Sequence, residues 1–246
     1  IDAYKEGLKL LDENFPLVAA KKFSEAEILY PQSMWAPRSS LMSAYSYYYG
    51  SYYLNAIDEL NRFIKIYPKH ERFVFARYLL AMCYYEQITD EKKDLGSIIE
   101  AQQNFQYVLK NHPNTDYAID SEYKLELIKE ILASKEIYLA NYYIEREKWI
   151  PAINRFKNVV EKYETTIYVE EALHRLVEIH YKIGLIKESK KYAALLGYNY
   201  QSSDWYRESY KVFNKDYKKI SKIKKNKKKN KISTLEKIKS LLRNEK

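Results

Sequence analysis

Few residues in this sequence combine the types and the spacing that catalysis or metal binding requires. The four histidines are His70, His112, His174 and His180, and no two of them stand three or four residues apart, the spacing that places two metal ligands on one helical face. The single cysteine, Cys83, has no histidine or lysine nearby to activate its thiol, so we expect it to be a packed side chain. The sequence therefore predicts a protein that is not an enzyme and that has no metal site and no cofactor.

The composition removes further classes of function. The chain has 246 residues, of which 46% are hydrophobic and 30% are charged, a balance typical of folded proteins. No stretch approaches the roughly 20 apolar residues that a membrane-spanning helix needs. With only five glycines, the chain contains neither of the glycine-rich motifs of nucleotide-binding loops. Tyrosine is abundant, with 27 copies, and its side chain suits binding because it offers a large contact area and a hydroxyl group.

The positive charge of the chain is concentrated at its C-terminal end. Residues 214–246 contain 14 Lys+Arg and 3 Asp+Glu, a balance of +11 against +9 for the whole chain, so residues 1–213 carry −2. We expect a disordered lysine-rich run over 215–231, followed by a short amphipathic helix with a capping box at Ser233 and Glu236. We interpret this tail as a solvated extension, with a lipid or protein contact as the alternative. Nucleic acid is not an expected partner, because no aromatic residue for base stacking follows Tyr217.

The elements that must position the tyrosines are helices arranged in a repeat. A small residue, a large apolar residue and a second apolar residue recur at fixed spacing, often followed by a proline that ends the helix. The copies are Ala19-x3-Phe23-x2-Ala26-x4-Pro31, Ala56-x3-Leu60-x2-Phe63-x4-Pro68, Ala101-x3-Phe105-x2-Val108-x4-Pro113, Ala152-x3-Phe156-x2-Val159 and the degenerate Ser189-x3-Ala193-x2-Leu196. The preceding helices carry Gly7-x2-Leu10, Ala44-x2-Tyr47, Ala81-x2-Tyr84 and Ala140-x2-Tyr143.

This pattern resembles the tetratricopeptide repeat, a helix-turn-helix unit of about 34 residues. It predicts an all-α solenoid of about five repeats over residues 1–213, with a polar insertion at 89–97 inside the third repeat. In such an array the first helix of each repeat lines a concave groove that recognises peptides. Counting from Ala44 and Ala81, the predicted groove residues are Arg38, Tyr45, Tyr48, Tyr49, Tyr78, Met82 and Tyr85, accompanied by Leu41, Met42, Phe75, Leu79 and Glu86. The alternative is that some of these tyrosines only fill helix–helix contacts.

An ordered set of motifs resembles one family within this class. The motifs are Ala20-Lys21-Lys22-Phe23-x-Glu25, Tyr30-Pro31-x3-Trp35-Ala36-Pro37, Arg62-Phe63-Ile64-x3-Pro68-x-His70, Pro113-Asn114-x2-Tyr117-Ala118-x-Asp120 and Ala140-x-Tyr142-Tyr143-x2-Arg146-x2-Trp149-x2-Ala152-x-Asn154-Arg155. They are similar to the BamD family, the tetratricopeptide lipoproteins of the bacterial outer-membrane β-barrel assembly machinery. One departure is Glu147, which stands where the family has a glycine, so we expect the turn there to differ.

The resemblance implies a protein at the periplasmic face of the outer membrane, held by a lipidated N-terminal cysteine that this sequence does not include. It implies that the N-terminal repeats, residues 1–118, bind the C-terminal targeting signal of unfolded β-barrel substrates. The C-terminal repeats, residues 119–213, would dock the POTRA region of the barrel-forming subunit and other assembly lipoproteins. The residues expected nearest those partners are Arg146, Trp149, Asn154, Arg155, Arg175 and Tyr181. The repeat pattern alone also permits a tetratricopeptide adaptor for a different protein partner.

Overall fold

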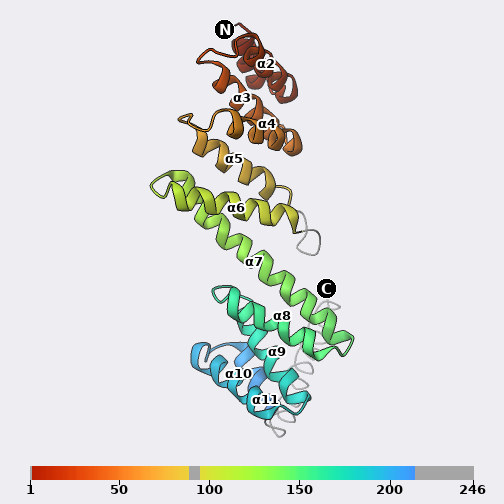
Figure 1. Ribbon diagram of the computed structural model, residues 1–246. Helices are drawn as coiled ribbons and strands as arrows, with labels where there is room; N and C mark the ends of the chain where they lie inside the picture. Colours follow the sequence, from red (N-terminus) through yellow and green to blue (C-terminus); the bar gives the residue numbers. More distant parts are fainter. Residues whose placement is uncertain (1, 89–94, 214–246) are drawn as a thin grey trace, which may run out of the picture. The chain divides into compact units, whose positions relative to one another are not determined.

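The computed structural model describes residues 2–88 and 95–213, which form eleven α-helices and no strand (Figure 1). The helices are α1 (Asp2–Asp12), α2 (Pro16–Leu29), α3 (Ala36–Tyr49), α4 (Tyr53–Ile66), α5 (Phe73–Tyr85), α6 (Gly96–Asn111), α7 (Asp116–Glu145), α8 (Trp149–Lys162), α9 (Val169–Lys182), α10 (Ile186–Asn199) and α11 (Asp204–Phe213). The all-α prediction is confirmed. The predicted basic tail and most of the 89–97 insertion lie outside the described residues.

Successive helices form the five predicted repeats, from α1/α2 to α9/α10, and α11 follows the last of them. The prolines end helices as predicted, since Pro31, Pro68 and Pro113 each stand two residues after the last residue of α2, α4 and α6. The described chain divides into two compact units, residues 1–135 and the residues from Glu136 onward. The boundary falls within α7, which is longer than the other described helices.

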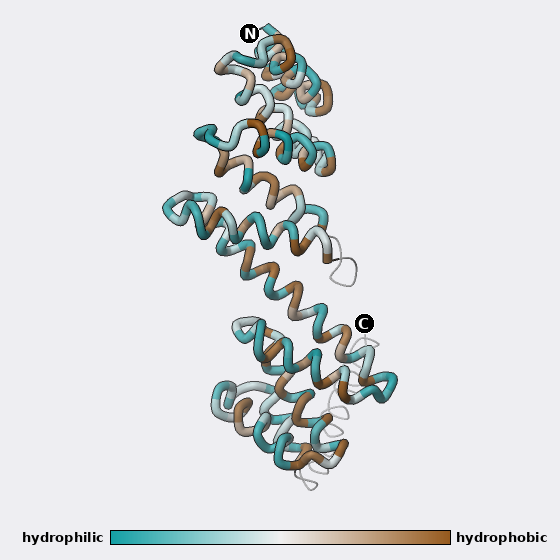
Figure 2. The backbone as a smooth tube through the Cα atoms, viewed as in Figure 1, coloured by the Kyte–Doolittle hydropathy of each residue, from teal (hydrophilic) through white to brown (hydrophobic). Residues whose placement is uncertain are grey.

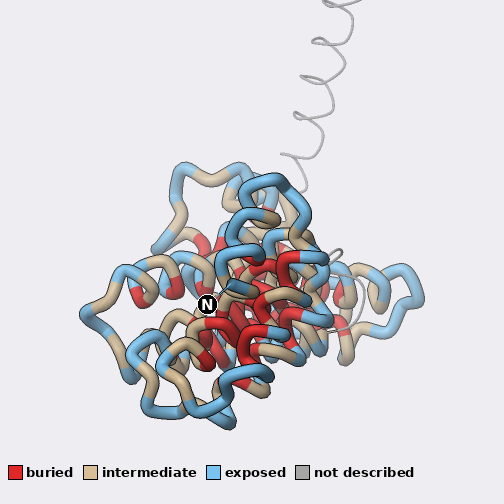
Figure 3. The backbone as a smooth tube through the Cα atoms, turned by 90° about the horizontal axis from the view of Figure 1, so that it is seen from above, coloured by how far each residue is buried: buried red, intermediate tan, exposed pale blue. Residues whose placement is uncertain are grey.

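The recurring residues of the repeat form the core. Phe23, Leu60, Phe105 and Phe156 occupy equivalent positions in successive repeats, and each is fully buried. Figure 3 marks the buried positions in red. Gly7 takes the place of the small residue in the first repeat, because a Cβ atom there would lie only 2.9 Å from the ring of Phe23. Small residues at these positions therefore allow paired helices to approach closely.

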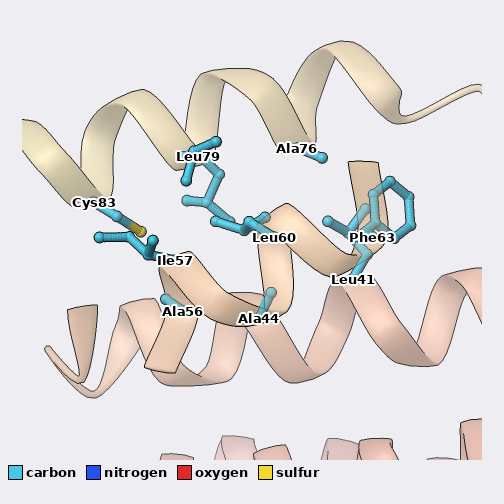
Figure 4. Close-up of a cluster of buried hydrophobic side chains, with 10 residues drawn as sticks. Leu41, Ala44, Ala56, Ile57, Leu60, Phe63, Ala76, Leu79 and Cys83 are labelled. Carbon is cyan, nitrogen blue, oxygen red and sulfur yellow. The ribbon is translucent and has the colours of Figure 1, made fainter. Parts of the chain in front are cut away.

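One cluster shows how neighbouring repeats share a core (Figure 4). Leu41 and Ala44 of α3 meet Leu60 and Phe63 of α4, and Cys83 reaches the same cluster from α5. Cys83 is fully buried, and burial raises the pKa of its thiol to about 12. The prediction of a packed thiol is confirmed.

Hydrophobic residues recur along each helix without forming a long apolar run (Figure 2). No described helix is long and apolar enough to cross a membrane.

The turns inside four repeats share one backbone geometry. A residue with positive φ stands two positions before the second helix, and the residue after it donates its N–H to a carbonyl five positions earlier, at 2.8–2.9 Å. This is the Schellman arrangement, in which a left-handed residue satisfies the last carbonyls of a helix. The left-handed residues are Asn14 (φ 62°), Ser51 (φ 61°), Glu147 (φ 55°) and Gly184 (φ 87°). The expectation that Glu147 changes its turn is therefore wrong, because Glu147 adopts the conformation that glycine favours.

Glu147→Gly is expected to raise the free energy of unfolding by about 0.5–1 kcal/mol. A non-glycine residue in the left-handed region costs about 1–2 kcal/mol, and the greater freedom of an unfolded glycine cancels part of the gain. Chemical denaturation of the two proteins measures the difference. Asn14→Gly is the matched control and should gain less, because asparagine tolerates this conformation. A loss of stability in Glu147→Gly would show that the side chain of Glu147 makes a compensating interaction.

Candidate functional site

A cavity of about 330 Å³ lies between α1, α3 and the beginning of α5. Its lining residues are Tyr4, Arg38, Leu41, Met42, Tyr45, Arg72 and Phe75. Five of these are predicted groove positions from two successive repeats, and the fold brings them to one concave site. Tyr4 and Arg72 were not among the predicted residues. Arg72 stands three residues before Phe75, so extending the helical spacing from Ala81 by one more turn would have predicted it. Tyr4 belongs to the first repeat, and no spacing in the sequence indicated that it lines this cavity.

The α3 side of the cavity follows from helical spacing. Arg38, Leu41, Met42 and Tyr45 recur at intervals of three and four residues, which places them on one face of the helix. Tyr49 continues that face, since its ring stacks on Tyr45 with the centroids 6.4 Å apart. Tyr49 is 54% exposed, so this tyrosine pair extends the accessible aromatic surface beyond the cavity.

The cavity combines an apolar floor with two guanidinium groups. Leu41, Met42 and Phe75 supply the apolar surface, and Arg38 and Arg72 supply the positive charge. The Nη2 atom of Arg38 lies 3.9 Å from Oε1 of Glu71, a long and exposed ion pair that is worth little in water. The guanidinium of Arg38 therefore stays available to a ligand. This arrangement suits an apolar or aromatic side chain that is followed by a negative group.

The other predicted groove residues are more deeply packed. Tyr78 donates its hydroxyl to Oδ2 of Asp120 at 2.7 Å, and burial together with this carboxylate raises the pKa of Tyr78. Lys124 lies over the ring of Tyr85, with Nζ 4.7 Å from the centroid. Met82 is 8% exposed. α7 thus covers the part of the predicted groove formed by Tyr78, Met82 and Tyr85, whereas Phe75 of the same helix lines the open cavity.

Tyr48 lies between the two parts of the predicted surface. Its ring centroid is 6.0 Å from that of Tyr53, and the residue packs against the apolar clusters on both sides of it. Burial raises the pKa of its hydroxyl to about 12, with a smaller contribution from the nearby charge of Glu86. Tyr48 therefore keeps its proton at physiological pH and can act as a hydrogen-bond donor.

A second cavity of about 520 Å³ adjoins the first, and Tyr4 lines both. Its other lining residues are Asp2, Ala26, Tyr30, Ser33, Trp35 and Ser39. The rings of Tyr4 and Trp35 lie 5.3 Å apart between centroids. The N-terminal repeats therefore present two aromatic cavities in succession, the first with arginines and the second with an aspartate.

Three of the predicted partner residues gather near the start of α8. The guanidinium carbon of Arg146 lies 3.5 Å from the ring centroid of Tyr142. Trp149 opens α8, and Nζ of Lys182, the last residue of α9, lies 4.1 Å from its ring centroid. Asn154 is exposed on α8. This end of the α8/α9 pair therefore offers a cationic and aromatic surface that a partner could reach.

The remaining predicted partner residues already have partners within the chain. Arg155 donates from Nη1 to Oε1 of Glu136 at 3.1 Å, which ties α8 to α7. Arg175 donates to Oε2 of Glu178 at 2.8 Å. Although burial opposes it, hydrogen bonds from His174 and Arg175 lower the pKa of Glu178 to about 2. Arg155 thus joins the two helices of its repeat, whereas the ion pair of Arg175 lies within α9.

Tyr181 and the histidines of α9 also serve packing. The ring of Tyr181 meets that of Phe213 edge-on, with the centroids 5.5 Å apart. Nδ1 of His174 lies 2.8 Å from Oγ of Ser209, and Nδ1 of His180 lies 2.7 Å from the carbonyl of Leu176. These rings therefore fix α11 and the last turn of α9. Within residues 2–88 and 95–213, no group of three or more His, Cys, Asp or Glu could hold a metal ion.

Comparison with known proteins agrees with the family that the sequence motifs indicated. Residues 1–196 match the family model YfiO, described as outer membrane lipoprotein. The outer membrane protein assembly factor BamD of Rickettsia prowazekii is 39% identical over 209 residues, covering 85% of this chain and 83% of that protein. BamD of Caulobacter vibrioides is 38% identical over 211 residues, covering 86% of this chain and 69% of that protein.

A solved structure of the TPR2AB domain of yeast Sti1 in complex with pHSP90 matches with a TM-score of 0.46 and 13% identity, covering 86% of this chain and 80% of that chain. The assignment rests on the family model and the sequence relatives, which confirm the resemblance drawn from the motifs. The chain belongs to the BamD family of outer membrane protein assembly factors.

Proposed function

We propose that this protein is a non-enzymatic scaffold in the assembly of outer-membrane β-barrel proteins. Its relatives in Rickettsia and Caulobacter are named outer membrane protein assembly factors, and its family is described as outer membrane lipoprotein. We place it at the periplasmic face of the outer membrane, held by an N-terminal lipid anchor. The observation that supports a binding function is the cavity between α1, α3 and α5, because an apolar floor and positively charged side chains line the same concave site.

The ligand proposed for this cavity is the targeting segment of an unfolded β-barrel substrate, an extended peptide with an aromatic end. The aromatic side chain would lie against Tyr45 and Phe75, which line the cavity from two successive repeats. Arg38 and Arg72 would meet a negative group, such as the terminal carboxylate of the peptide, through charge-assisted hydrogen bonds. Tyr49 would extend the contact along the peptide because it remains exposed next to Tyr45.

The residues from Glu136 onward are proposed to dock the POTRA region of the barrel-forming subunit and other assembly lipoproteins. The accessible candidates are Arg146, Trp149 and Asn154, which lie on α8 and the turn before it. The aromatic ring and guanidinium group are side chains that protein interfaces favour. Arg155 would support this surface indirectly, because its ion pair with Glu136 holds α8 against α7, whereas the ion pair of Arg175 with Glu178 lies within α9.

The peptide site is tested by Tyr45→Ala in a binding experiment. The probe is a fluorescently labelled peptide that ends in phenylalanine with a free carboxylate, and fluorescence anisotropy measures its dissociation constant. Removal of the aromatic ring is expected to reduce the binding free energy by about 1.5–3 kcal/mol, so the dissociation constant should rise at least about tenfold. Tyr198→Ala is the matched control, because Tyr198 is 84% exposed on α10 and does not line the cavity.

The carboxylate contact is tested with the same peptide after amidation of its C-terminus. We expect the amide to bind the wild-type protein more weakly than the free acid, Arg38→Gln to reduce that difference, and the double variant with Arg72→Gln to remove it. Circular dichroism establishes that each variant is folded. Equal affinities of wild type and a folded Tyr45→Ala variant would contradict the assignment of this cavity and leave open a tetratricopeptide adaptor for another partner.

A further inference from the structure

Arg77 on α5 is a half-buried arginine whose pairing differs from that of the other packed arginines. Arg62, Arg155 and Arg175 each form an ion pair with a glutamate of the chain. Arg77 instead donates from Nη1 to Oδ1 of Asn104 at 3.1 Å, and its Nε atom is buried without a hydrogen-bond partner. Among residues 2–88 and 95–213, no carboxylate forms an ion pair with it. The guanidinium of Arg77 therefore has no carboxylate within ion-pair distance among these residues, and a ligand could supply one.

The guanidinium of Arg77 is held in a fixed orientation by aromatic rings. Its central carbon lies 4.7 Å from the ring centroid of Tyr107 on α6 and 5.6 Å from that of Phe73 at the start of α5. The bond to Asn104 fixes the group further. A planar donor that is already oriented loses little conformational freedom when a ligand binds, so this geometry favours recognition.

A cavity of about 290 Å³ opens beside this guanidinium, between α4, α5 and α6. Its polar lining consists of the amides of Asn61, Gln103 and Asn104 and the hydroxyls of Tyr84 and Tyr107. Glu100 is the one acidic residue among the described residues of the lining, and Arg77 is the one basic residue. The cavity thus surrounds a single cation with polar side chains.

This cavity is separate from the proposed peptide site. Successive residues of a helix are rotated by about 100°, so Arg77 and Tyr84 lie on the face of α5 opposite to Phe75 and Met82. The cavity lined by Phe75 shares no residue with the cavity lined by Arg77. A ligand could therefore occupy either site independently of the other.

We propose that the Arg77 cavity docks a carboxylate side chain, an aspartate or glutamate of a protein partner. A carboxylate is planar and can accept two parallel hydrogen bonds from one edge of a guanidinium, here the edge formed by the two Nη atoms, because the Nε is buried. A singly charged anion fits a site with one cation and the nearby Glu100, whereas a doubly charged phosphate would need more positive charge. Leu80, which also lines the cavity, would contact the methylene groups of the side chain.

The test is a nuclear magnetic resonance titration of the full chain labelled with ¹⁵N. The probe is N-acetylglutamate α-amide, and its neutral counterpart N-acetylglutamine amide and inorganic phosphate are compared at matched ionic strength. We expect a saturable shift of the Arg77 Nε–H and Asn104 side-chain amide resonances with the glutamate probe, no such shift with the glutamine probe, and weaker binding of phosphate.

Arg77→Lys keeps the charge but removes the planar pair of donors, so we expect about tenfold weaker binding, read from the Asn104 amide. Lys110→Gln is the matched control for charge, because Lys110 is exposed on α6 and lines neither cavity, and this variant should bind as the wild type does. If Arg77→Lys fails to fold, Gln103→Ala removes an exposed lining amide and should still weaken binding. The proposal is overturned by a shift that does not saturate, by equal binding of the glutamine probe, by tighter binding of phosphate, or by unchanged binding in the folded variants.

Discussion

Replacing Arg62 by alanine is expected to lower the free energy of unfolding by about 3 kcal/mol, because it leaves the buried carboxylate of Glu27 without its cation. Arg62 binds that carboxylate through both Nη atoms, at 2.9 and 2.6 Å. Its Nη2 also donates to Glu59 and to Ser40. The network joins α2, α3 and α4, so it holds the first two repeats together. Tyr67 donates to Glu27 at 2.9 Å, and its pKa is raised to about 12 by burial and this hydrogen bond.

The measurement is urea denaturation followed by circular dichroism, with a double-mutant cycle to isolate the pair. The side chain of Glu27 is 8% exposed and that of Arg62 is 38% exposed. Loss of the ion pair therefore costs free energy mainly because the buried carboxylate is left without a counter-charge. In a Glu27→Gln background the charge is already absent, and Arg62→Ala should then cost only about 1 kcal/mol. A loss below about 1 kcal/mol in the single variant would show that water or a neighbouring group replaces the guanidinium.

Phe63→Ala, one residue further along the same helix, is expected to cost about 3–5 kcal/mol for a different reason. Phe63 is fully buried in the cluster that α3, α4 and α5 share (Figure 4). Its ring also meets those of Tyr67 and His70, with centroids 5.4 and 5.6 Å away. Alanine would leave a cavity between two repeats that the rigid helices could close only in part.

The same denaturation experiment measures this loss. Phe63→Leu is the matched control and should cost clearly less, because leucine fills most of the volume. A cost of Phe63→Ala below about 1.5 kcal/mol would contradict the idea that this ring joins repeats two and three.

Together the two variants distinguish the two ways in which neighbouring repeats are held together. Salt should weaken the effect of Arg62→Ala more than that of Phe63→Ala, because ions screen a partly exposed pair and leave an apolar contact unchanged. Arg62 and Phe63 are adjacent in the sequence, yet one contacts a buried charge and the other an apolar cluster.

The helices, the repeats and the buried positions could be predicted from the amino-acid sequence. These features depend on local rules: apolar residues recur with the helical period, and proline cannot continue a helix. Ala56, Leu60 and Phe63 could therefore be assigned to the core from their spacing, and all three are buried. The motif from Ala140 to Arg155 likewise indicated the family, which the relatives confirm.

The tertiary structure alone decided which side chains meet across helices. Tyr45 and Tyr78 are both predicted groove residues, yet Tyr45 lines an open cavity and Tyr78 donates to Asp120 of α7. Likewise, no local pattern assigns Glu136 to Arg155 or leaves the Nε of Arg77 unpaired. The physical reason is that spacing fixes the face of a helix on which a residue lies, whereas its partner depends on how the next helix packs against that face.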